Sequence, residues 1–561
     1  MLTLFLLLVV STTSASVPPL QPLVFAKIYS DYMVLQRDRP ASIWGWSDPN
    51  TTIYITLKDM NNNTVTTSAD VNSDTNGRWK ILLPAQAAST PPVSVIATSS
   101  KEGVDSGTAT ITNVLFGDVY LCSGQSNMAF SVATPTNDEK AEAEIVQMYR
   151  NDPGASRNGY VSTDAAIKDS SNYPSLRFLV IGNKQIVPNP IQDYYPSPGN
   201  NNSDLTLTHP WQQPSPSTIG VGKDVMGGLE PGTMSATCYY FGLELHQTQN
   251  IPIGLIHSSY GGSAVEDWIS QETLGDGTTG PCIGNITHSM GIPSNQYNGQ
   301  IRPLMNMTIT GAIWYQGESN HGQNQLYTCR YELMMKEWRK QWNVGTDGAT
   351  DLHFPIGFVQ VGPLSGVDVP MMTNNSDSFL IRMGQTAGYG YAPNQRWPNS
   401  FMATAFDLSN PIGTHAFWGN IHIFNKQAVA HRLALSARNM IYNESLVYSG
   451  PRVIQAVVND ATNQLIVSFD VIGTEGKGIL LRGMFGFEIS SNGKVWERLN
   501  VTSNTKTTVV LNKTGTTTDV QFVRYAWEDG LSVFNHTGPA VFNGEGLPAT
   551  PFLINVTKFK I

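Results

Sequence analysis

The sequence predicts an α/β protein with a mostly parallel central sheet and a β-rich region on either side. Five apolar runs in the middle of the chain alternate with longer segments of helical periodicity. This pattern is typical of strands that helices bury on both faces. Residues from about 23 to 112, and those after Pro451, instead alternate short β-rich runs with turn clusters, which indicates antiparallel β-sandwiches.

Length and the N-terminus set the expected domain boundaries. A chain of 561 residues is too long for one core, so several domains are expected. The first ten residues, MLTLFLLLVV, are apolar and are followed by STTSAS, which is typical of a secretory signal peptide cleaved near Ala15 or Ser16. The expected organisation is a signal peptide at 1–16, an N-terminal β-sandwich at 17–112, the α/β domain at 113–445 and a C-terminal β-sandwich at 446–561.

The α/β region begins at Val114. Its predicted strands are VLFGDVYLC (114–122), SLRFLVI (175–181), IPIGLIHSS (251–259), ITGAIWYQG (309–317) and FPIGFVQVG (354–362). Its predicted helices are SATCYYFGLELHQTQ (235–249), RYELMMKEWRKQW (330–342) and NKQAVAHRLALSARNMIY (425–442). Between Asn183 and Gly227 a stretch rich in Pro, Asn and Ser has no clear period, so we expect a long surface loop near the rim of the sheet.

Composition excludes several classes of partner. The formal charge of −9 is spread along the chain without a block of Lys or Arg, so nucleic acid is not an expected partner. No later stretch approaches the roughly 18 continuous apolar residues of a membrane helix, so we expect no membrane anchor and a lysosomal or secreted location. In that setting several of the glycosylation sequons at Asn50, Asn285, Asn306, Asn443, Asn500 and Asn535 are credible, and each would place its Asn on an exposed loop if glycosylated.

The cysteines leave the disulfide pattern open. Cys122, Cys238, Cys282 and Cys329 permit three pairings. We expect one bridge that involves Cys282. We expect Cys122 to be free, because it lies in an apolar run and its simplest interpretation is a small, buried, apolar side chain. The chain has no CxxC pair, so no zinc site is expected.

Four segments place polar side chains or glycines where open α/β sheets build their sites, at the carboxyl ends of strands. Three of them directly follow apolar runs, namely GQSNM (124–128), SSYGGS (258–263) and WYQGESN (314–320). The fourth, GNIH (419–422), lies just before the last predicted helix.

These segments supply candidates for nucleophilic catalysis. A serine hydroxyl is a weak nucleophile that needs a base and a group that orients the base. Ser126 is the nucleophile candidate and His422 the base candidate. Glu318, and less favourably Asp407, is the expected acid beside the base. Two other histidines compete for the role of base, His415 in a loop and His431 within a helical run.

The oxyanion that develops during acyl transfer needs N–H donors aimed at it. The expected donors are the backbone N–H groups of Ser126 and Gly262 and a side-chain amide, from either Gln316 or Asn320. Metal is not part of this constellation.

Each segment alone also has a structural interpretation. A serine after a strand is most often a turn or a helix cap, and Gly261-Gly262 alone is most often a turn. Glu318 at the end of an apolar strand is harder to explain structurally, because a carboxylate near a core needs a partner or a polar cleft. The G-x-S-x-G elbow fails at Met128, which argues against the α/β-hydrolase fold.

Taken together, the segments resemble the SGNH (GDS-like) hydrolase superfamily and, within it, the sialate O-acetylesterase family. The similar blocks are GQSNM with Ser126, YGGSAVEDW (260–268), WYQGESN (314–320) and NIHIFNKQAVAHRL (420–433). The resemblance covers nearly the whole chain. It implies a flavodoxin-like three-layer sandwich and hydrolysis of O-acetyl esters of sialic acids with release of acetate. It implies no cofactor and no metal.

Two departures from the superfamily pattern bear on the site. Many members carry an Asp two or three residues before the base, but Asn420 and Gly419 stand there. The acid that orients the base is then Glu318 or Asp407, or the site is a Ser–His dyad that has no such acid. The third block, WYQGESN, also lacks the G-x-N-D motif of the superfamily. Gln316 is therefore preferred as the side-chain oxyanion donor. Two alternative functions are an acetylesterase acting on plant or microbial polysaccharide and a non-catalytic glycan-binding protein.

Overall fold

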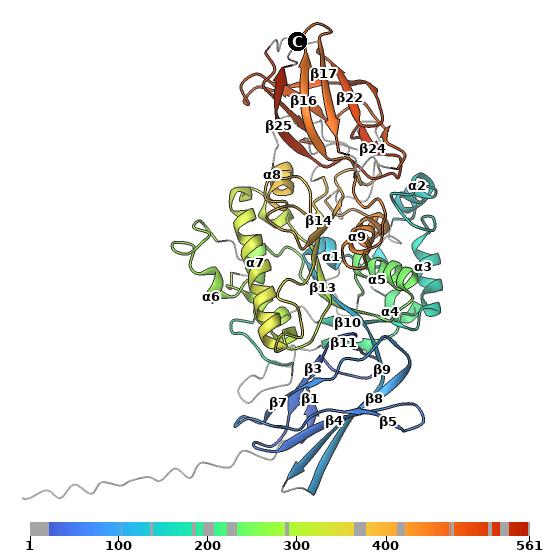
Figure 1. Ribbon diagram of the computed structural model, residues 1–561, viewed down its shortest axis with the longest axis vertical. Coiled ribbons are helices and arrows are strands. Elements are labelled where there is room, and N and C mark those ends of the chain that lie inside the picture. Colours follow the sequence, from blue (N-terminus) through green and yellow to red (C-terminus); the bar gives the residue numbers. More distant parts are fainter. Residues whose placement is uncertain are drawn as a thin grey trace, which may run out of the picture.

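The computed structural model describes residues 22–101, 104–134, 138–181, 187–194, 207–221, 233–286, 291–363, 377–411, 421–470, 472, 476–513, 519–527 and 538–558. The expected signal peptide, His415 and the sequon at Asn535 lie outside these residues. Figure 1 shows an N-terminal β region, a central α/β region and a C-terminal β region in succession along the long axis. Within the described ranges, no helix has the length and apolar character to cross a membrane.

Six parallel strands form the central sheet. In spatial order they are β10 (Leu176–Ile181), β12 (Ile253–Ser259), β9 (Val104–Gly124), β13 (Gly311–Tyr315), β14 (Ile356–Gln360) and β15 (Ser400–Thr404). All five predicted central strands are present, and β15 is an addition. The expectation of a long surface loop from 183 to 227 is wrong in part, because β11 (Leu207–Gln212) pairs antiparallel with β10 and α4 (Pro216–Ile219) follows it.

Helices cover both faces of this sheet because neighbouring residues of each strand point to opposite sides. On one face, Trp314 of β13 packs edge-to-face against Trp338 of α7 (Asn324–Gly345) at a centroid distance of 5.6 Å. On the other, Tyr120 of β9 packs against Phe241 of α5 (Ala236–Gln249) at 5.3 Å. Helix α9 (Lys426–Met440) lies beside α5 on that second face (Figure 1). All three predicted helices are confirmed.

Smaller helices surround this core. They are α1 (Ser126–Ala129), α2 (Glu139–Tyr149), α3 (Thr163–Asp169), α6 (Gln271–Leu274) and α8 (Asp377–Gly384).

The N-terminal β region is joined to the central sheet by one continuous strand. The first part of β9 pairs antiparallel with β8 (Ser89–Lys101), and its end pairs with β12 and β13. The expected boundary at 112/113 therefore falls inside a strand. The remaining strands are β1 (Val24–Phe25), β2 (Val34–Gln36), β3 (Ala41–Trp46), β4 (Thr52–Lys58), β5 (Thr64–Thr67), β6 (Val71–Asn72) and β7 (Arg78–Leu83).

The C-terminal region is a β structure around its own apolar core. Eight strands follow one another in the order β20 (Glu497–Leu499), β19 (Phe487–Ser490), β23 (Phe522–Tyr525), β25 (Phe552–Lys558), β16 (Val453–Asn459), β17 (Gln464–Phe469), β22 (Thr508–Asn512) and β21 (Val501–Asn504). Neighbours are antiparallel except β16 and β25. A separate pair consists of β18 (Ile479–Leu481) and β24 (Val541–Asn543).

The four cysteines form two disulfides. Cys122 is bonded to Cys238, and Cys282 to Cys329. The bridge that involves Cys282 is confirmed, whereas the expectation of a free Cys122 is wrong. The physical reason is that Cys122 points from β9 towards the face that α5 covers, where Cys238 lies in the first turn of that helix.

Replacing Cys122 and Cys238 together by alanine is expected to destabilise the central region strongly. The bridge closes a loop with a sequence separation of 116 residues, for which chain entropy gives a loss of roughly 4–5 kcal/mol. Differential scanning calorimetry should show a clearly lower transition temperature, and the paired Cys282 and Cys329 variant should show a somewhat smaller shift. An unchanged thermogram for the first variant would contradict the importance of this link.

The sequons differ in exposure. The asparagines Asn50, Asn285, Asn443 and Asn500 are exposed, as expected. Asn306 is not, since it is only 5% exposed and its carbonyl oxygen accepts a hydrogen bond from the Tyr29 hydroxyl. Its sequon partner Thr308 accepts from the Ser42 N–H at 2.9 Å. The Asn306 segment packs against the N-terminal region, so the exposed loop that glycosylation would require is not found there.

Candidate active site

Ser126 lies at the carboxyl end of the central sheet, where a tight turn joins β9 to α1. Gly124 ends the strand with φ +144°, and a Cβ there would lie 2.1 Å from the carbonyl oxygen of Tyr315. The next N–H, from Gln125, donates to that same oxygen at 3.0 Å. The turn therefore requires glycine because β13 passes close by. Ser126 itself is half-buried, and neither its Oγ nor its N–H is bonded to a described residue.

The two residues that flank Ser126 hold the other blocks against it. The Gln125 Oε1 accepts from the Ser319 N–H at 3.1 Å. The Asn127 Nδ2 donates to Glu318 Oε1 at 2.6 Å and to the Ile421 carbonyl oxygen at 2.7 Å. Side chains next to Ser126 thus bind both the WYQGESN block and the residue before His422. The sequence signal for these contacts is the pair of amide side chains, Gln125 and Asn127, on either side of Ser126 in an otherwise apolar segment.

His422 has a backbone that is fixed on both sides. Its carbonyl oxygen accepts from Asn410 Nδ2 at 2.8 Å, and Asn410 Oδ1 accepts from the Phe424 N–H at 2.8 Å. Asn425 then caps α9 by accepting from the Ala428 N–H. No hydrogen bond joins Ser126 Oγ to the His422 ring in this structure. Hydrogen bonds between catalytic groups often tighten only when substrate is bound.

Gly262 lies at the same edge of the sheet, just after β12. The strand register pairs Ser259 with Gly124, and the Tyr260 N–H donates to the Gly124 carbonyl oxygen at 2.9 Å. Gly262 is exposed with φ +75°, and a Cβ there would have no atom within 4 Å. Its N–H donates to no described residue. This N–H is therefore available to a ligand.

The expectation that Gln316 supplies an oxyanion donor is corrected. Its Nε2 donates to the Ser263 carbonyl oxygen at 3.1 Å and to Asn320 Oδ1 at 2.7 Å. An amide NH₂ has two hydrogens, so both are already used. Gln316 is also fully buried, and its Oε1 accepts from the Tyr327 hydroxyl. The sequence alone does not show that the Gln316 amide bonds to Ser263 and Asn320 instead of facing Ser126.

Asn320, the other amide candidate, is buried as well. Its Nδ2 donates to Glu266 Oε2 at 2.8 Å, and Glu266 forms a buried ion pair with Arg330. The amides of the third block therefore hold the second and third blocks together. Among the expected oxyanion donors, the backbone N–H groups of Ser126 and Gly262 have no described partner, and the buried Asn320 amide uses one of its two hydrogens.

Neither expected acid forms a hydrogen bond with His422. Glu318 bonds to Asn127, its Oε2 has no hydrogen-bond partner, and burial raises the pKa of its carboxyl group. Asp407 instead binds Arg432 with both oxygens, at 2.7 and 2.8 Å, and is 1% exposed. The expectation that Glu318 or Asp407 orients the base directly is therefore corrected. The hydrogen bonds of Glu318 and Asp407 go to Asn127 and Arg432, and a Ser–His dyad, the third possibility that the sequence left open, stays a prediction.

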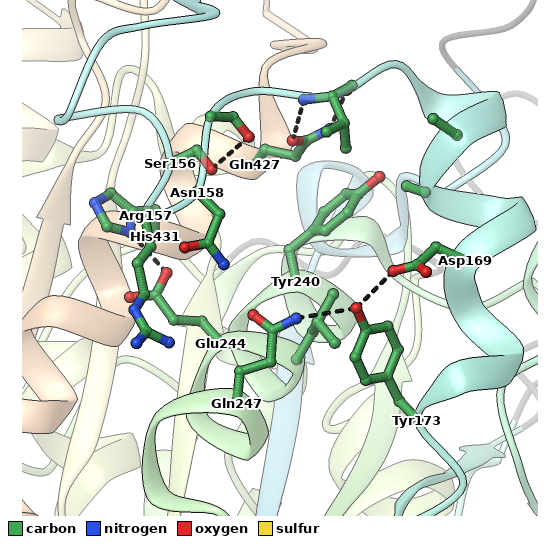
Figure 2. Close-up of a pocket in the computed structure, with 15 residues that line it drawn as sticks. Ser156, Arg157, Asn158, Asp169, Tyr173, Tyr240, Glu244, Gln247, Gln427 and His431 are labelled. Carbon is green, nitrogen blue, oxygen red and sulfur yellow. Dashed lines mark hydrogen bonds and ion pairs between the residues drawn. The ribbon is translucent and has the colours of Figure 1, made fainter.

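His431, one of the competing bases, lies in a separate pocket of about 370 Å³ between α3, α5 and α9 (Figure 2). Its Nδ1 is 2.6 Å from Glu244 Oε2, and its Nε2 is 3.0 Å from the Pro153 carbonyl oxygen. The residues that line this pocket include neither Ser126 nor His422. Both ring nitrogens of His431 are engaged in structural contacts, so it is not the base for Ser126.

A second buried histidine lies on β12, close to the site. The His257 Nε2 is 2.7 Å from Ser259 Oγ, and its Nδ1 is 3.2 Å from the Thr233 carbonyl oxygen. Burial lowers the pKa of His257 to about 4, from an ordinary value of 6.5. Between pH 6.5 and about 4, the ring of His257 is therefore neutral in the folded protein and protonated in the unfolded chain.

Acidification is expected to destabilise the fold through His257. Between pH 6.5 and about 4 the unfolded state binds a proton that the folded state does not, so stability falls as the pH drops through this window. The loss through this group is on the order of 3 kcal/mol at pH 4. Thermal unfolding measured across this range should show a shallower pH dependence for His257→Gln than for the wild type. Equal slopes would contradict the assignment.

Comparison with known proteins identifies the family of the chain. A family model described as carbohydrate esterase, sialic acid-specific acetylesterase, matches residues 197–361. A second, described as sialate O-acetylesterase C-terminal domain, matches residues 454–556. Among solved structures, a carbohydrate acetylesterase from Xanthomonas citri is similar, with a TM-score of 0.68, 26% identity, and coverage of 95% of this chain and 99% of that one.

Curated relatives extend the similarity over almost the whole chain. The sialate O-acetylesterase of Homo sapiens is 32% identical over 550 residues, which cover 95% of this chain and 92% of the relative. That of Mus musculus is 30% identical over 571 residues, which cover 95% of this chain and 94% of the relative. The chain therefore belongs to the sialate O-acetylesterase family.

Proposed function

We propose that this protein is a serine esterase that hydrolyses O-acetyl esters of sialic acids and releases acetate through an acetyl-enzyme. The observation that carries the proposal is the 2.7 Å hydrogen bond from Asn127 Nδ2 to the Ile421 carbonyl oxygen. This bond joins the residue after Ser126 to the residue before His422, so the two segments meet at one edge of the sheet, which supports the assignment of Ser126 as nucleophile and His422 as base. Membership of the family identifies the substrate class.

In this mechanism the Ser126 Oγ attacks the acetyl carbonyl carbon while His422 accepts the hydroxyl proton. The backbone N–H groups of Ser126 and Gly262 hold the oxyanion that forms. The sugar oxygen then leaves with the proton from His422, and an acetyl ester on Ser126 remains. Water, deprotonated by His422, attacks this ester, and acetate leaves as Ser126 regains its proton. No metal or cofactor takes part in the proposed steps.

We also propose a flavodoxin-like SGNH arrangement of the central layers and passage through the secretory pathway to the lysosome or the outside of the cell. The apolar N-terminal segment supports this route. Two disulfides in the described residues fit an oxidising compartment. The four exposed sequon asparagines are available for glycosylation.

Parallel hydrolysis assays test the substrate. The purified protein should release acetate from O-acetylated sialic acid with a much higher kcat/KM than from acetylated xylan. A preference for xylan would replace the sialate proposal by a polysaccharide acetylesterase. Absence of hydrolysis of either substrate and of an aryl acetate would instead indicate a non-catalytic glycan-binding protein.

A further inference from the structure

A lysine is buried directly beneath the nucleophile segment. Lys426, the first residue of α9, is 1% exposed, and its Nζ donates to the Oδ1 of Asn127. The same Nζ lies 4.8 Å from the ring centroids of both Phe130 and Tyr315. Burying an ammonium group is costly unless charged or polar groups compensate for the lost water. Two aromatic faces and an amide oxygen provide part of that compensation.

The contacts of Lys426 fix the orientation of the Asn127 amide. An ammonium group can only donate, so it must face the amide oxygen. On the other side, the Nδ2 donates to two acceptors, Glu318 Oε1 and the Ile421 carbonyl oxygen. Turning the amide over would place its NH₂ against the ammonium and its oxygen against the carboxylate. The two charged groups therefore hold the amide in one orientation.

Glu318 is the counter-charge to Lys426 in this cluster. The acid and the lysine bind opposite ends of one amide, and Glu318 is 8% exposed with no hydrogen bond to its Oε2. Burial lowers the pKa of Lys426 to about 7, and the Glu318 carboxylate opposes that shift. The ammonium form of the lysine therefore depends on the acid. This pairing accounts for a buried carboxylate that does not reach His422.

We propose that Lys426 is a positioning residue that acts through the Asn127 amide to hold the Ser126 and His422 segments at the spacing needed for proton transfer. The inference rests on the proposed roles of Ser126 and His422. Its geometric basis is that the amide held by Lys426 is the one that bonds to Ile421, directly before the base. Lys426 touches neither substrate nor the reacting atoms in this scheme.

The variant Lys426→Met tests the inference, since methionine can fill the space between the two rings without donating a hydrogen bond. Small misplacements of reacting groups cost up to roughly a hundredfold in rate. We expect kcat for an aryl acetate to fall by roughly ten- to a hundredfold, with KM nearly unchanged. Labelling of Ser126 by a serine-directed phosphonate should slow by the same factor. The matched control is Gln427→Met, because Gln427 bonds to Val161 in the separate pocket, and it should keep the wild-type kcat.

A double variant separates positioning from stability. Lys426→Met alone leaves Glu318 buried without its counter-charge, whereas Lys426→Met with Glu318→Gln removes both charges. We expect the double variant to regain most of the lost thermal stability but to keep the low kcat. Recovery of kcat together with stability, or a wild-type kcat in the folded single variant, would overturn the inference. If Ser126→Ala also retained activity, the proposed function itself would be wrong. This result differs from a wild-type kcat in Lys426→Met alone, which would contradict only the role of Lys426.

Discussion

Ser126→Ala is expected to lower kcat/KM for O-acetylated sialic acid by roughly 10⁴- to 10⁶-fold. In the proposed mechanism the Ser126 hydroxyl is the group that forms the acetyl-enzyme, so the substitution removes the nucleophile. Ser126 is half-buried and its Oγ is free of described partners, so its removal disturbs no hydrogen bond of the fold. Activity should be measured by acetate release, and the folded state by circular dichroism.

The matched control for this prediction is Ser156→Ala. Ser156 lines the separate pocket (Figure 2), where its Oγ donates to the Gly159 carbonyl oxygen. This variant should keep the wild-type kcat/KM. Near-full activity of Ser126→Ala would show that another group is the nucleophile.

His422→Ala is expected to have the second-largest effect, a loss of roughly 10⁴-fold or more in kcat. The serine and the histidine act as a unit, so removing either one loses most of the catalysis that they provide together. In a dyad the imidazole is the only group that accepts the serine proton. KM should change little, since the ring is not required to bind the sugar. Steady-state kinetics on an aryl acetate, which has a good leaving group, would separate acylation from the later proton donation.

His431→Gln provides the comparison for His422. His431 lies beside Glu244 in the separate pocket, so its loss is expected to affect stability and to leave kcat close to that of the wild type. A large loss of kcat for His431→Gln and a small loss for His422→Ala would contradict the assignment of His422 as the base.

The sequence predicted the strands and helices of the central region well because their apolar periodicity is long and regular. It missed β15, although this strand is buried throughout, and it missed β11, which lies within a stretch rich in loop-forming residues. The free Cys122 was a reasonable expectation from burial alone. Whether a second cysteine faces it depends on how α5 packs, which no local pattern contains.

The site was predictable where backbone placement decides it. Ser126, Gly262 and the segment of His422 follow strands or precede a helix, and the parallel sheet brings them to one edge. The partners of Gln316, Glu318 and Asp407 were not predictable, because a carboxylate or amide near a site can bind any of several neighbours. Spacing along the chain does not record which neighbour lies within 3 Å.

The most direct test of the dyad is covalent labelling of the wild-type protein with a serine-directed phosphonate, followed by mass-spectrometric mapping of the modified residue. We predict a single modification, on Ser126, that blocks acetate release in proportion to its extent and forms far more slowly in His422→Ala. Modification of a different serine, or full hydrolytic activity in protein whose Ser126 is completely labelled, would contradict the account.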